Sequence, residues 1–309
     1  MAVLMTACSS GPALRDLELP IQRVELSSTP FFAQDRYQCG PAALATVLVS
    51  DGVEITPDEL VSHIYIPERQ GSLQAEIIAA TRRFDRVPYV LEPSLQDLLA
   101  EVASGKPVLV LQNLGIRLVP QWHYAVVIGY DAPADSLLLR SGTNERLSMT
   151  RSRFLGTWVR ADQWALLAVA PDQPPVTAQV QDWLRSASAF EELGRPEIAA
   201  EAYEAATRRW PDQPLAWNAL ANARYAMADL TAAESALRHS LQLHPSAVAY
   251  NNLAHVLSRR GCAVEAMDQL VMAESMDDSD AITALLLSTR QSITAEFGYA
   301  DQSIQSCRQ

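Results

Sequence analysis

The stretch YQCGPAALATVL, residues 37–48, decides the fold of the first half of the chain. Cys39 stands where an extended segment turns into a helix. Gly40 permits a tight backbone turn, Pro41 suits the first helical turn, and the Ala, Leu and Val residues that follow are typical of a helix. The first-turn N–H groups and the helix dipole favour negative charge, so a thiol placed here can serve as a nucleophile. The open alternative is a buried structural cysteine.

A histidine later in the chain favours the nucleophile hypothesis. His123 precedes the apolar run YAVVIGY, residues 124–130, which predicts a buried strand that ends in a turn at residues 131–135. Residues 137–140 predict the returning strand, so His123 lies at the open end of a hairpin. A lone histidine at a strand start is more often an ordinary surface or core residue. Together with a cysteine at a helix start, it suits a general base.

These two blocks together resemble the double-glycine leader peptidases, which are papain-like, bacteriocin-processing cysteine peptidases, and their free-standing relatives. The resemblance covers about residues 24–170 and rests on Gln34-x4-Cys39-Gly-Pro-Ala-Ala-Leu and Trp122-His123-Tyr-Ala-Val-Val-Ile-Gly-Tyr-Asp. It implies that Cys39 is the nucleophile, His123 the general base and Gln34 an oxyanion-hole donor beside the backbone N–H of the cysteine. An ordinary loop glutamine is the alternative for Gln34. Trp122 is expected to pack over the imidazole.

The residue that orients the histidine departs from the family pattern. The family places an Asp on the strand that returns from the histidine hairpin, and Ser141 occupies that place here. Asn144 is a nearby amide that can orient the imidazole, as the asparagine of papain-like enzymes does. Asp131 is predicted to be a turn residue that points away. The departure leaves open a catalytically weak or inactive peptidase fold that serves as an envelope scaffold and binds peptides or proteins.

Other patterns between and around these blocks predict an α+β papain-like domain over residues 24–170. A capping box, TPDE at residues 56–59, starts a helix. Helices followed by antiparallel strands give the α+β class. The expected helices cover residues 74–84, 94–103 and 150–158, and the expected strands cover residues 24–26, 87–91, 107–111 and 164–169.

The N-terminus, residues 1–23, resembles a bacterial lipoprotein cleavage box followed by a tether. Apolar and small residues precede Cys8, which would become the lipidated first residue. No Lys or Arg precedes it and the apolar part is shorter than a signal peptide, so we expect the true start to lie upstream. The alternative is an ordinary frayed terminus. The lipoprotein hypothesis predicts a periplasm-facing protein of the bacterial cell envelope, and Ser9 favours the outer membrane.

A Pro-rich linker at residues 171–178 separates the peptidase-like domain from an all-α domain at residues 179–300. A period of 34 residues appears beyond the linker. This pattern resembles three tetratricopeptide repeats over about residues 179–279, followed by a capping helix at residues 281–297. Such arrays usually bind a peptide or a partner protein in their concave face. The pairs that show the period are Trp183 and Trp217, Ala199 and Ala233, and Pro211 and Pro245.

Two cysteines remain, Cys262 in the repeats and Cys307 in the C-terminal tail at residues 301–309. An oxidising envelope compartment would allow a disulfide between them, which would tie the tail to the third repeat. Two free thiols are the alternative.

Composition fits this organisation and excludes several functions. The 309 residues are 49% hydrophobic and 19% charged, as in soluble globular domains with ample cores. The formal net charge of −12 argues against nucleic acid as a partner and against a polybasic membrane patch, so we expect membrane contact only through a lipid anchor. No apolar run is long enough to span a bilayer. The histidines are scattered and no phosphate-binding loop occurs, so no metal or other cofactor is expected.

The sequence therefore predicts a cysteine peptidase that hydrolyses peptide bonds of exported peptides or proteins. The reaction would pass through a thioester on Cys39, with His123 acting first as base and then as acid. The expected partners are a peptide or protein substrate and a partner protein bound by the repeats. The resemblance suggests a double-glycine cleavage site.

Overall fold

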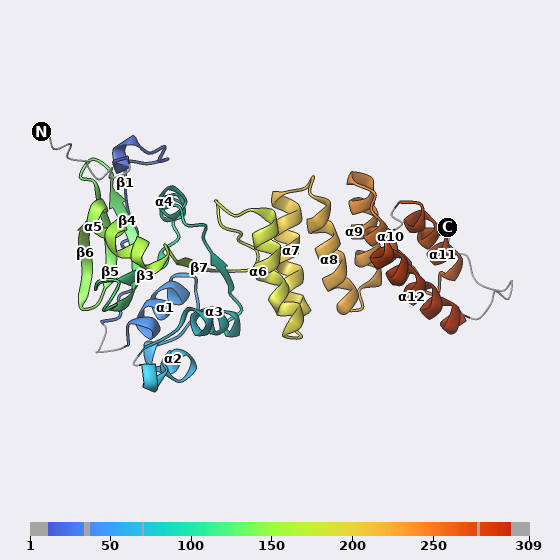
Figure 1. Cartoon of the computed structure of the whole chain (residues 1–309), viewed down its shortest axis with the longest axis horizontal. Helices are drawn as coiled ribbons and strands as arrows, with labels where there is room; N and C mark the ends of the chain where they lie inside the picture. The colour runs from blue at the N-terminus through green and yellow to red at the C-terminus, as the bar shows by residue number, and fades with distance from the viewer. Residues whose placement is uncertain (1–11, 34–37, 70, 277–278, 298–309) are drawn as a thin grey trace, which may run out of the picture. The chain divides into compact units, whose positions relative to one another are not determined.

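The computed structural model describes residues 12–33, 38–69, 71–276 and 279–297. The chain divides into two compact units, whose elements are labelled in Figure 1. One unit extends to Ala170 and takes in Pro175–Ala178 as well, while the other comprises Pro171–Pro174 and the chain from Gln179 onward. The predicted linker is thus divided between the two units.

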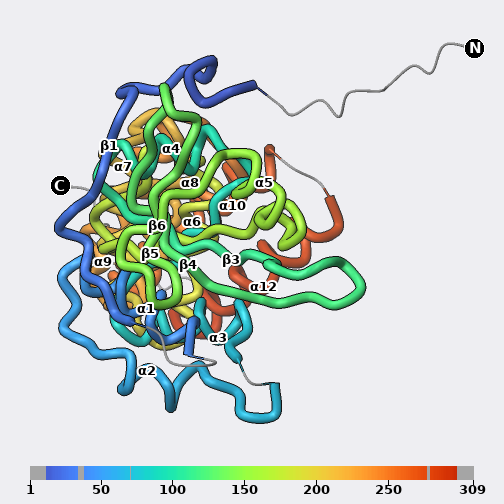
Figure 2. Tube along the Cα trace, turned by 90° about the vertical axis from the view of Figure 1, so that its left-hand side faces the viewer, coloured from blue at the N-terminus to red at the C-terminus, as the bar shows by residue number. Residues whose placement is uncertain are grey.

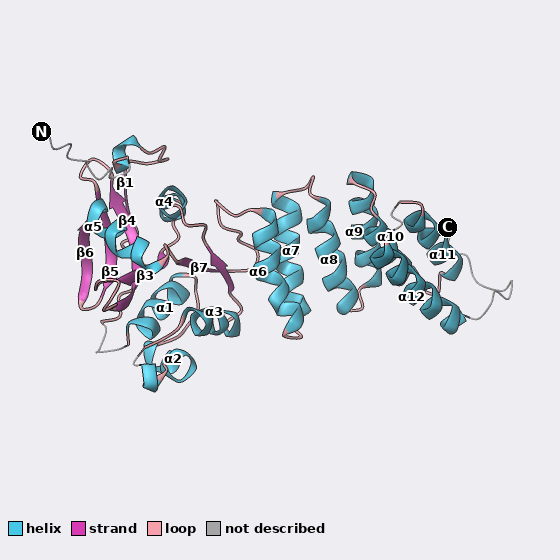
Figure 3. Cartoon of the chain, in the orientation of Figure 1, coloured by secondary structure: helices cyan, strands magenta, loops and turns pink. Residues whose placement is uncertain are grey.

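The first unit is built on an antiparallel sheet, whose strands are the magenta arrows of Figure 3. The strands lie in the order β2-β7-β3-β4-β5-β6, and β1 pairs with β4. The strands are β1 (Arg23–Glu25), β2 (Val87–Val90), β3 (Val108–Asn113), β4 (Trp122–Asp131), β5 (Ser136–Ser141), β6 (Asn144–Thr150) and β7 (Ala165–Val169).

The described residues of this unit include five α-helices, of which α1 lies at the centre of the core. Every residue of α1 from Gly40 to Leu48 is buried, which agrees with its uniformly apolar sequence. Leu44 and Leu48 belong to the same buried cluster as Tyr124 and Val126 of β4. The helices are α1 (Cys39–Ser50), α2 (Pro57–Ile64), α3 (Gln74–Arg83), α4 (Leu95–Ala103) and α5 (Arg151–Trp158), with 3-10 turns at Leu14–Asp16, Pro67–Arg69 and Val159–Ala161.

The α+β class and most of the expected elements are confirmed. The capping box at the start of α2 is formed: the Thr56 hydroxyl accepts from the backbone N–H of Glu59, whose carboxylate accepts from the N–H of Thr56. Strand β6 was not indicated by the sequence. It is the last strand in the order given above, and most of its side chains are exposed and polar. It therefore lacks the apolar pattern that predicts a buried strand.

The second unit is a helical array that confirms the predicted tetratricopeptide-repeat fold. Consecutive helices pack in pairs, and alanines at the repeated positions, among them Ala199, Ala233 and Ala266, are fully buried and let paired helices approach closely. Helix α12 packs on α10 and α11 as the expected cap. The helices are α6 (Val180–Glu192), α7 (Pro196–Arg209), α8 (Pro214–Ala226), α9 (Leu230–Leu243), α10 (Ala247–Arg259), α11 (Ala263–Glu274) and α12 (Asp280–Phe297).

Gly40 at the start of α1 gives a test of this packing. A Cβ atom at Gly40 would lie 2.4 Å from Ser72 Oγ and 2.7 Å from Ser72 Cβ, so either the helix start or the loop at residue 72 would have to move. We expect Gly40→Ala to lower the free energy of unfolding by about 1–3 kcal/mol. Urea unfolding followed by tryptophan fluorescence measures the change.

The matched control is Gly156→Ala in α5. There the nearest heavy atom to a new Cβ, Arg160 Nη1, is 3.9 Å away, which leaves room for the methyl group. Because alanine has the higher helix propensity, we expect this variant to be unchanged or more stable by about 0.5–1 kcal/mol. Equal effects of the two substitutions would contradict the tight packing of Gly40.

Candidate active site

The thiol of Cys39 is half-buried at the first residue of α1. Burial raises the pKa of the Cys39 thiol above its ordinary value. The nearby backbone N–H groups of Tyr124, Gly40 and Cys39 itself lower the pKa of this thiol but do not reverse the effect of burial. The sulfur therefore faces backbone donors of both its own helix and β4, which can stabilise negative charge at this point.

The contact with Tyr124 follows from the strand pairing. Leu111 pairs with Tyr124, but the N–H of Leu111 donates to the Trp164 carbonyl on its other side, at 3.2 Å. The pair is therefore a non-hydrogen-bonded one, in which the N–H of Tyr124 points away from β3. The pairing of β5 with β4 extends only as far as Val126, so the edge of β4 is open beside Tyr124. The thiol faces this open edge.

His123 directly precedes Tyr124 on β4. Its Nε2 atom is 2.9 Å from Ser141 Oγ, and burial lowers the pKa of the imidazole. Adjacent residues of a strand point to opposite faces, so the imidazole leaves β4 on the face opposite to the Tyr124 side chain. The thiol of Cys39 thus lies near the backbone of Tyr124, the residue that follows His123 on β4.

Of the two candidates for orienting the imidazole, Ser141 is the one whose side chain contacts it. Ser141 is buried at the end of β5, whereas Asn144 is exposed at the start of β6. Asp131 has the predicted turn role, because its carboxylate accepts from the N–H of Ala134 at 3.1 Å and pairs with Arg23 at 3.1 Å. A hydroxyl therefore stands where the family places a carboxylate.

Trp122 was predicted to pack over the imidazole, and this prediction is wrong. Its side chain is 55% exposed, and strand alternation places it on the face opposite to His123. Trp122 is thus adjacent to His123 in the sequence but does not cover its imidazole in the structure.

Three predicted site residues, Gln34, Cys8 and Cys307, lie outside the described residues. The oxyanion-hole and lipidation assignments therefore stay predictions. Cys39 is a free thiol, whereas Cys262, at the start of α11, is disulfide-bonded. The specific pairing of Cys262 with Cys307 also stays a prediction.

Gln112 is a polar neighbour of the histidine that the sequence analysis missed. It is fully buried and pairs directly with His123 across β3 and β4, so both side chains lie on one face. Its Nε2 donates to Thr157 Oγ1 at 2.6 Å, and that hydroxyl donates to the Phe154 carbonyl at 2.8 Å. Its Oε1 has no hydrogen-bond partner among the described residues, which leaves a buried acceptor beside the imidazole. The sequence did offer one signal for this residue, because Gln112 is a polar residue near the end of the otherwise apolar run VLVLQN.

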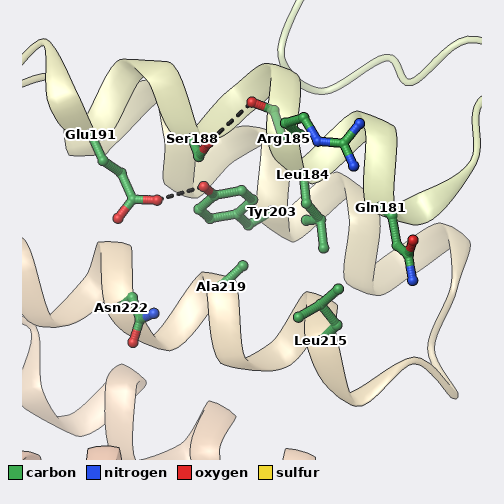
Figure 4. Close-up of a pocket in the computed structure, with 9 residues that line it drawn as sticks. All are labelled: Gln181, Leu184, Arg185, Ser188, Glu191, Tyr203, Leu215, Ala219 and Asn222. Carbon is green, nitrogen blue, oxygen red and sulfur yellow. Dashed lines mark hydrogen bonds between the residues drawn. The ribbon is translucent and has the colours of Figure 1, made fainter. Parts of the chain in front are cut away.

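The repeat unit carries a pocket of its own, with a volume of about 430 Å³, shown in Figure 4. Leucines and an alanine supply its apolar surface, and the hydroxyl of Tyr203 donates to the carboxylate of Glu191. A mixture of apolar surface and a few hydrogen-bonding groups is typical of a ligand-binding pocket. The lining residues are Gln181, Leu184, Arg185, Ser188 and Glu191 of α6, Tyr203 of α7, and Leu215, Ala219 and Asn222 of α8.

Neither a metal site nor a helix able to span a membrane is found in the part of the chain that the structure describes. No group of three or more His, Cys, Asp or Glu side chains is placed to hold a metal ion there. None of the described helices combines the length and the apolar character needed to cross a bilayer.

A helix that starts at a cysteine, an antiparallel sheet that carries a histidine and a following array of paired helices define a cysteine-peptidase-like fold joined to helical repeats. Residues 26–166 match the model of the Peptidase_C39 like family, and residues 180–223 match that of the tetratricopeptide repeat. The chain thus contains a C39-like peptidase domain at residues 26–166, followed by a tetratricopeptide-repeat match at residues 180–223.

Each part of the chain also matches solved structures at low sequence identity. A protein of Bacillus anthracis described as a C39-like peptidase is 19% identical, with a TM-score of 0.42, and the match covers 50% of this chain and 100% of that one. The peptidase domain of Streptococcus ComA, a bi-functional ABC transporter involved in quorum sensing, is 21% identical, with a TM-score of 0.39 and coverage of 46% and 98%.

The repeats are similar to the type III secretion chaperone SycD of Yersinia enterocolitica, solved with a peptide of the translocator YopD. That match has 15% identity, a TM-score of 0.35 and coverage of 38% of this chain and 94% of the chaperone. No curated protein matches the chain.

The pKa directions at the two residues predict how Cys39 reacts with pH. Burial raises the pKa of the thiol and lowers that of His123, so both groups are neutral at pH 7. We expect alkylation of Cys39 by iodoacetamide to be slow at pH 7 and to rise about tenfold per pH unit up to pH 9, as the thiolate fraction grows. Mass spectrometry of the peptide that contains Cys39 measures the rate. Fast alkylation that does not change between pH 6 and 8 would reveal a preformed ion pair and contradict this expectation.

Proposed function

We propose that this protein is a cysteine peptidase that hydrolyses peptide bonds of exported peptides or proteins. The observation that carries the proposal is the Cys39 thiol at the start of a buried helix, facing the backbone of β4 one residue after His123. The contact between His123 and Ser141 and the C39-like family match support the same function.

In the proposed mechanism the imidazole acts through Nδ1. With a proton on Nε2, the ring donates to Ser141 Oγ and keeps the Nδ1 lone pair for the thiol proton. The sulfur attacks the carbonyl carbon as Nδ1 takes this proton, and the imidazolium then gives it to the leaving amine. The peptide bond breaks and a thioester remains on Cys39. Water, deprotonated by Nδ1, hydrolyses the thioester and restores the thiol.

The electrostatics of this site require proton transfer during the attack. Because the thiol and the imidazole are both held neutral by burial, the negative sulfur forms only as the carbonyl is attacked. The backbone N–H of Cys39, with the side chain of Gln34 in the role that the resemblance implies, would stabilise the oxyanion. The Ser141 hydroxyl orients the ring but carries no charge, so it stabilises the imidazolium less than a carboxylate would.

A peptidase assay on a mixed peptide library tests the proposal. We expect cleavage by the full chain and a loss on the order of 10³-fold or more in kcat/KM for Cys39→Ala and for His123→Ala, because each removes one half of a coupled pair. Circular dichroism controls for folding. Cleavage that survives Cys39→Ala would assign the activity to another group or a contaminant.

The pH profile of that activity has a predicted direction. The base must be neutral, and burial lowers the pKa of His123, so its neutral form persists below the ordinary value of 6.5. We expect kcat/KM to fall on the acid side only below pH 6.5. Replacing Ser141 by Asp places a carboxylate beside the ring, which favours the imidazolium, so the midpoint of the acid limb should move to higher pH. A profile identical in the two proteins would show that residue 141 does not act on the base.

A catalytically weak or inactive peptide-binding scaffold is the second candidate. It is favoured by Ser141 in the place of the family carboxylate and by burial, which disfavours a reactive thiolate. Equal binding of a labelled peptide by wild type and Cys39→Ala, with no cleavage by either, would favour the scaffold.

Further parts of the proposal concern location and partners. The residues before Cys8 support a lipoprotein that faces the periplasm, probed by metabolic labelling with a palmitate analogue and its loss in Cys8→Ser. The pocket of the repeat unit supports binding of substrate or of a partner protein by the repeats.

A further inference from the structure

The hairpin that joins β3 to β4 exposes an unusual set of side chains. We call residues 114–122 the apolar hairpin; Figure 2 shows this turn reaching past the end of the sheet. Leu118 is 90% exposed and Ile116 and Val119 are each 63% exposed, while Leu114, nearer the sheet, is 47% exposed. Exposure is therefore greatest at the tip and smaller toward the base. A cluster of exposed aliphatic side chains of this kind marks a binding surface.

The apolar hairpin is held in shape by polar contacts at its base. Asn113 Oδ1 accepts from the N–H groups of Gly115 and Gln121, both at 3.0 Å, and the guanidinium of Arg160 donates to the Asn113 carbonyl at 2.9 Å. A Cβ at Gly115 would lie only 2.3 Å from the Val119 carbonyl oxygen. The two arms of the hairpin therefore lie so close together that only glycine fits at this position. The fold therefore presents the aliphatic side chains to solvent on a defined backbone.

No acidic residue lies within the apolar hairpin or near it in the sequence. Residues 107–130 contain no Asp or Glu, although the chain has 36 acidic residues, and the one charged side chain in the apolar hairpin is Arg117, next to its tip. A cation beside exposed aliphatic side chains, with Trp122 at the base, is the combination found where protein enters the interface of a phospholipid bilayer. Arg117 would meet the phosphate groups there.

The shape of this element favours a bilayer over a peptide as the occupant. Small-molecule sites are concave, and helical or Pro-rich peptides bind in grooves, so that the protein surrounds the ligand. The apolar hairpin is a projection whose most exposed side chain, Leu118, stands at its tip. A bilayer surface can receive such a projection, burying tip residues most deeply and leaving Trp122 at the level of the head groups.

We propose that the apolar hairpin inserts into the surface of a phospholipid bilayer, with Ile116, Leu118 and Val119 among the acyl chains and Arg117 at the phosphates. This contact is separate from any acyl group at Cys8 and does not depend on peptidase activity. It places His123, the residue that follows the hairpin, at the membrane surface.

The experiment uses the full chain carrying Cys8→Ser, so that no acyl anchor contributes. Co-sedimentation with vesicles of phosphatidylethanolamine and phosphatidylglycerol (3:1) measures binding. We expect the protein to bind and Leu118→Ser to weaken binding about tenfold or more, since it removes one buried leucine side chain from the lipid. Acyl chains brominated near the head group should quench tryptophan fluorescence, and Trp122→Phe should remove most of that quenching.

Leu193→Ser is the matched control, because Leu193 is 58% exposed and lies in the repeat unit. It should leave vesicle binding unchanged. The proposal is overturned if the protein does not bind vesicles or if Leu193→Ser weakens binding as much as Leu118→Ser. It is equally overturned if Leu118→Ser raises KM for peptide cleavage and leaves vesicle binding unchanged, because the surface would then belong to the substrate.

Discussion

The site depends on the open edge of β4 beside Tyr124. Because the pairing of β5 with β4 extends only to Val126, a backbone N–H of a central strand is left for an outside group, and α1 delivers the Cys39 thiol to it. The packing of α1 between its neighbours and one face of the sheet fixes where this thiol lies. A helix start and a strand edge are thus brought together by the core rather than by a flexible loop.

Burial gives this arrangement both its order and its chemical cost. It packs the thiol and the imidazole against the core, but it also disfavours the charged form of each group. A carboxylate behind the imidazole would offset part of this cost, and Ser141 provides only a neutral hydroxyl. The buried amide of Gln112, with one unpartnered acceptor among the described residues, is a second neutral group on the same face. The peptidase and scaffold hypotheses differ in whether neutral partners suffice.

The sequence predicted the elements whose structure depends on local residue patterns. It did not predict the contacts that depend on how the strands pair. Gly40, Pro41 and the apolar run were sufficient to predict α1, and the 34-residue period was sufficient for the repeats. The meeting of the thiol with Tyr124 depends on register between strands, which no local pattern specifies. The same applies to Gln112, whose importance comes from its partner across the sheet. Trp122 was misplaced because sequence proximity to His123 was taken for spatial contact, which strand alternation forbids.

The apolar hairpin has a consequence for the behaviour of the protein in aqueous buffer. Its aliphatic tip is fixed by Asn113 and cannot fold back to cover itself, so without a lipid surface the nearest apolar material is the same tip on another molecule. Self-association should therefore grow with protein concentration and disappear in mild detergent micelles. Apparent oligomers in detergent-free preparations would then reflect the absence of a lipid surface rather than a native assembly.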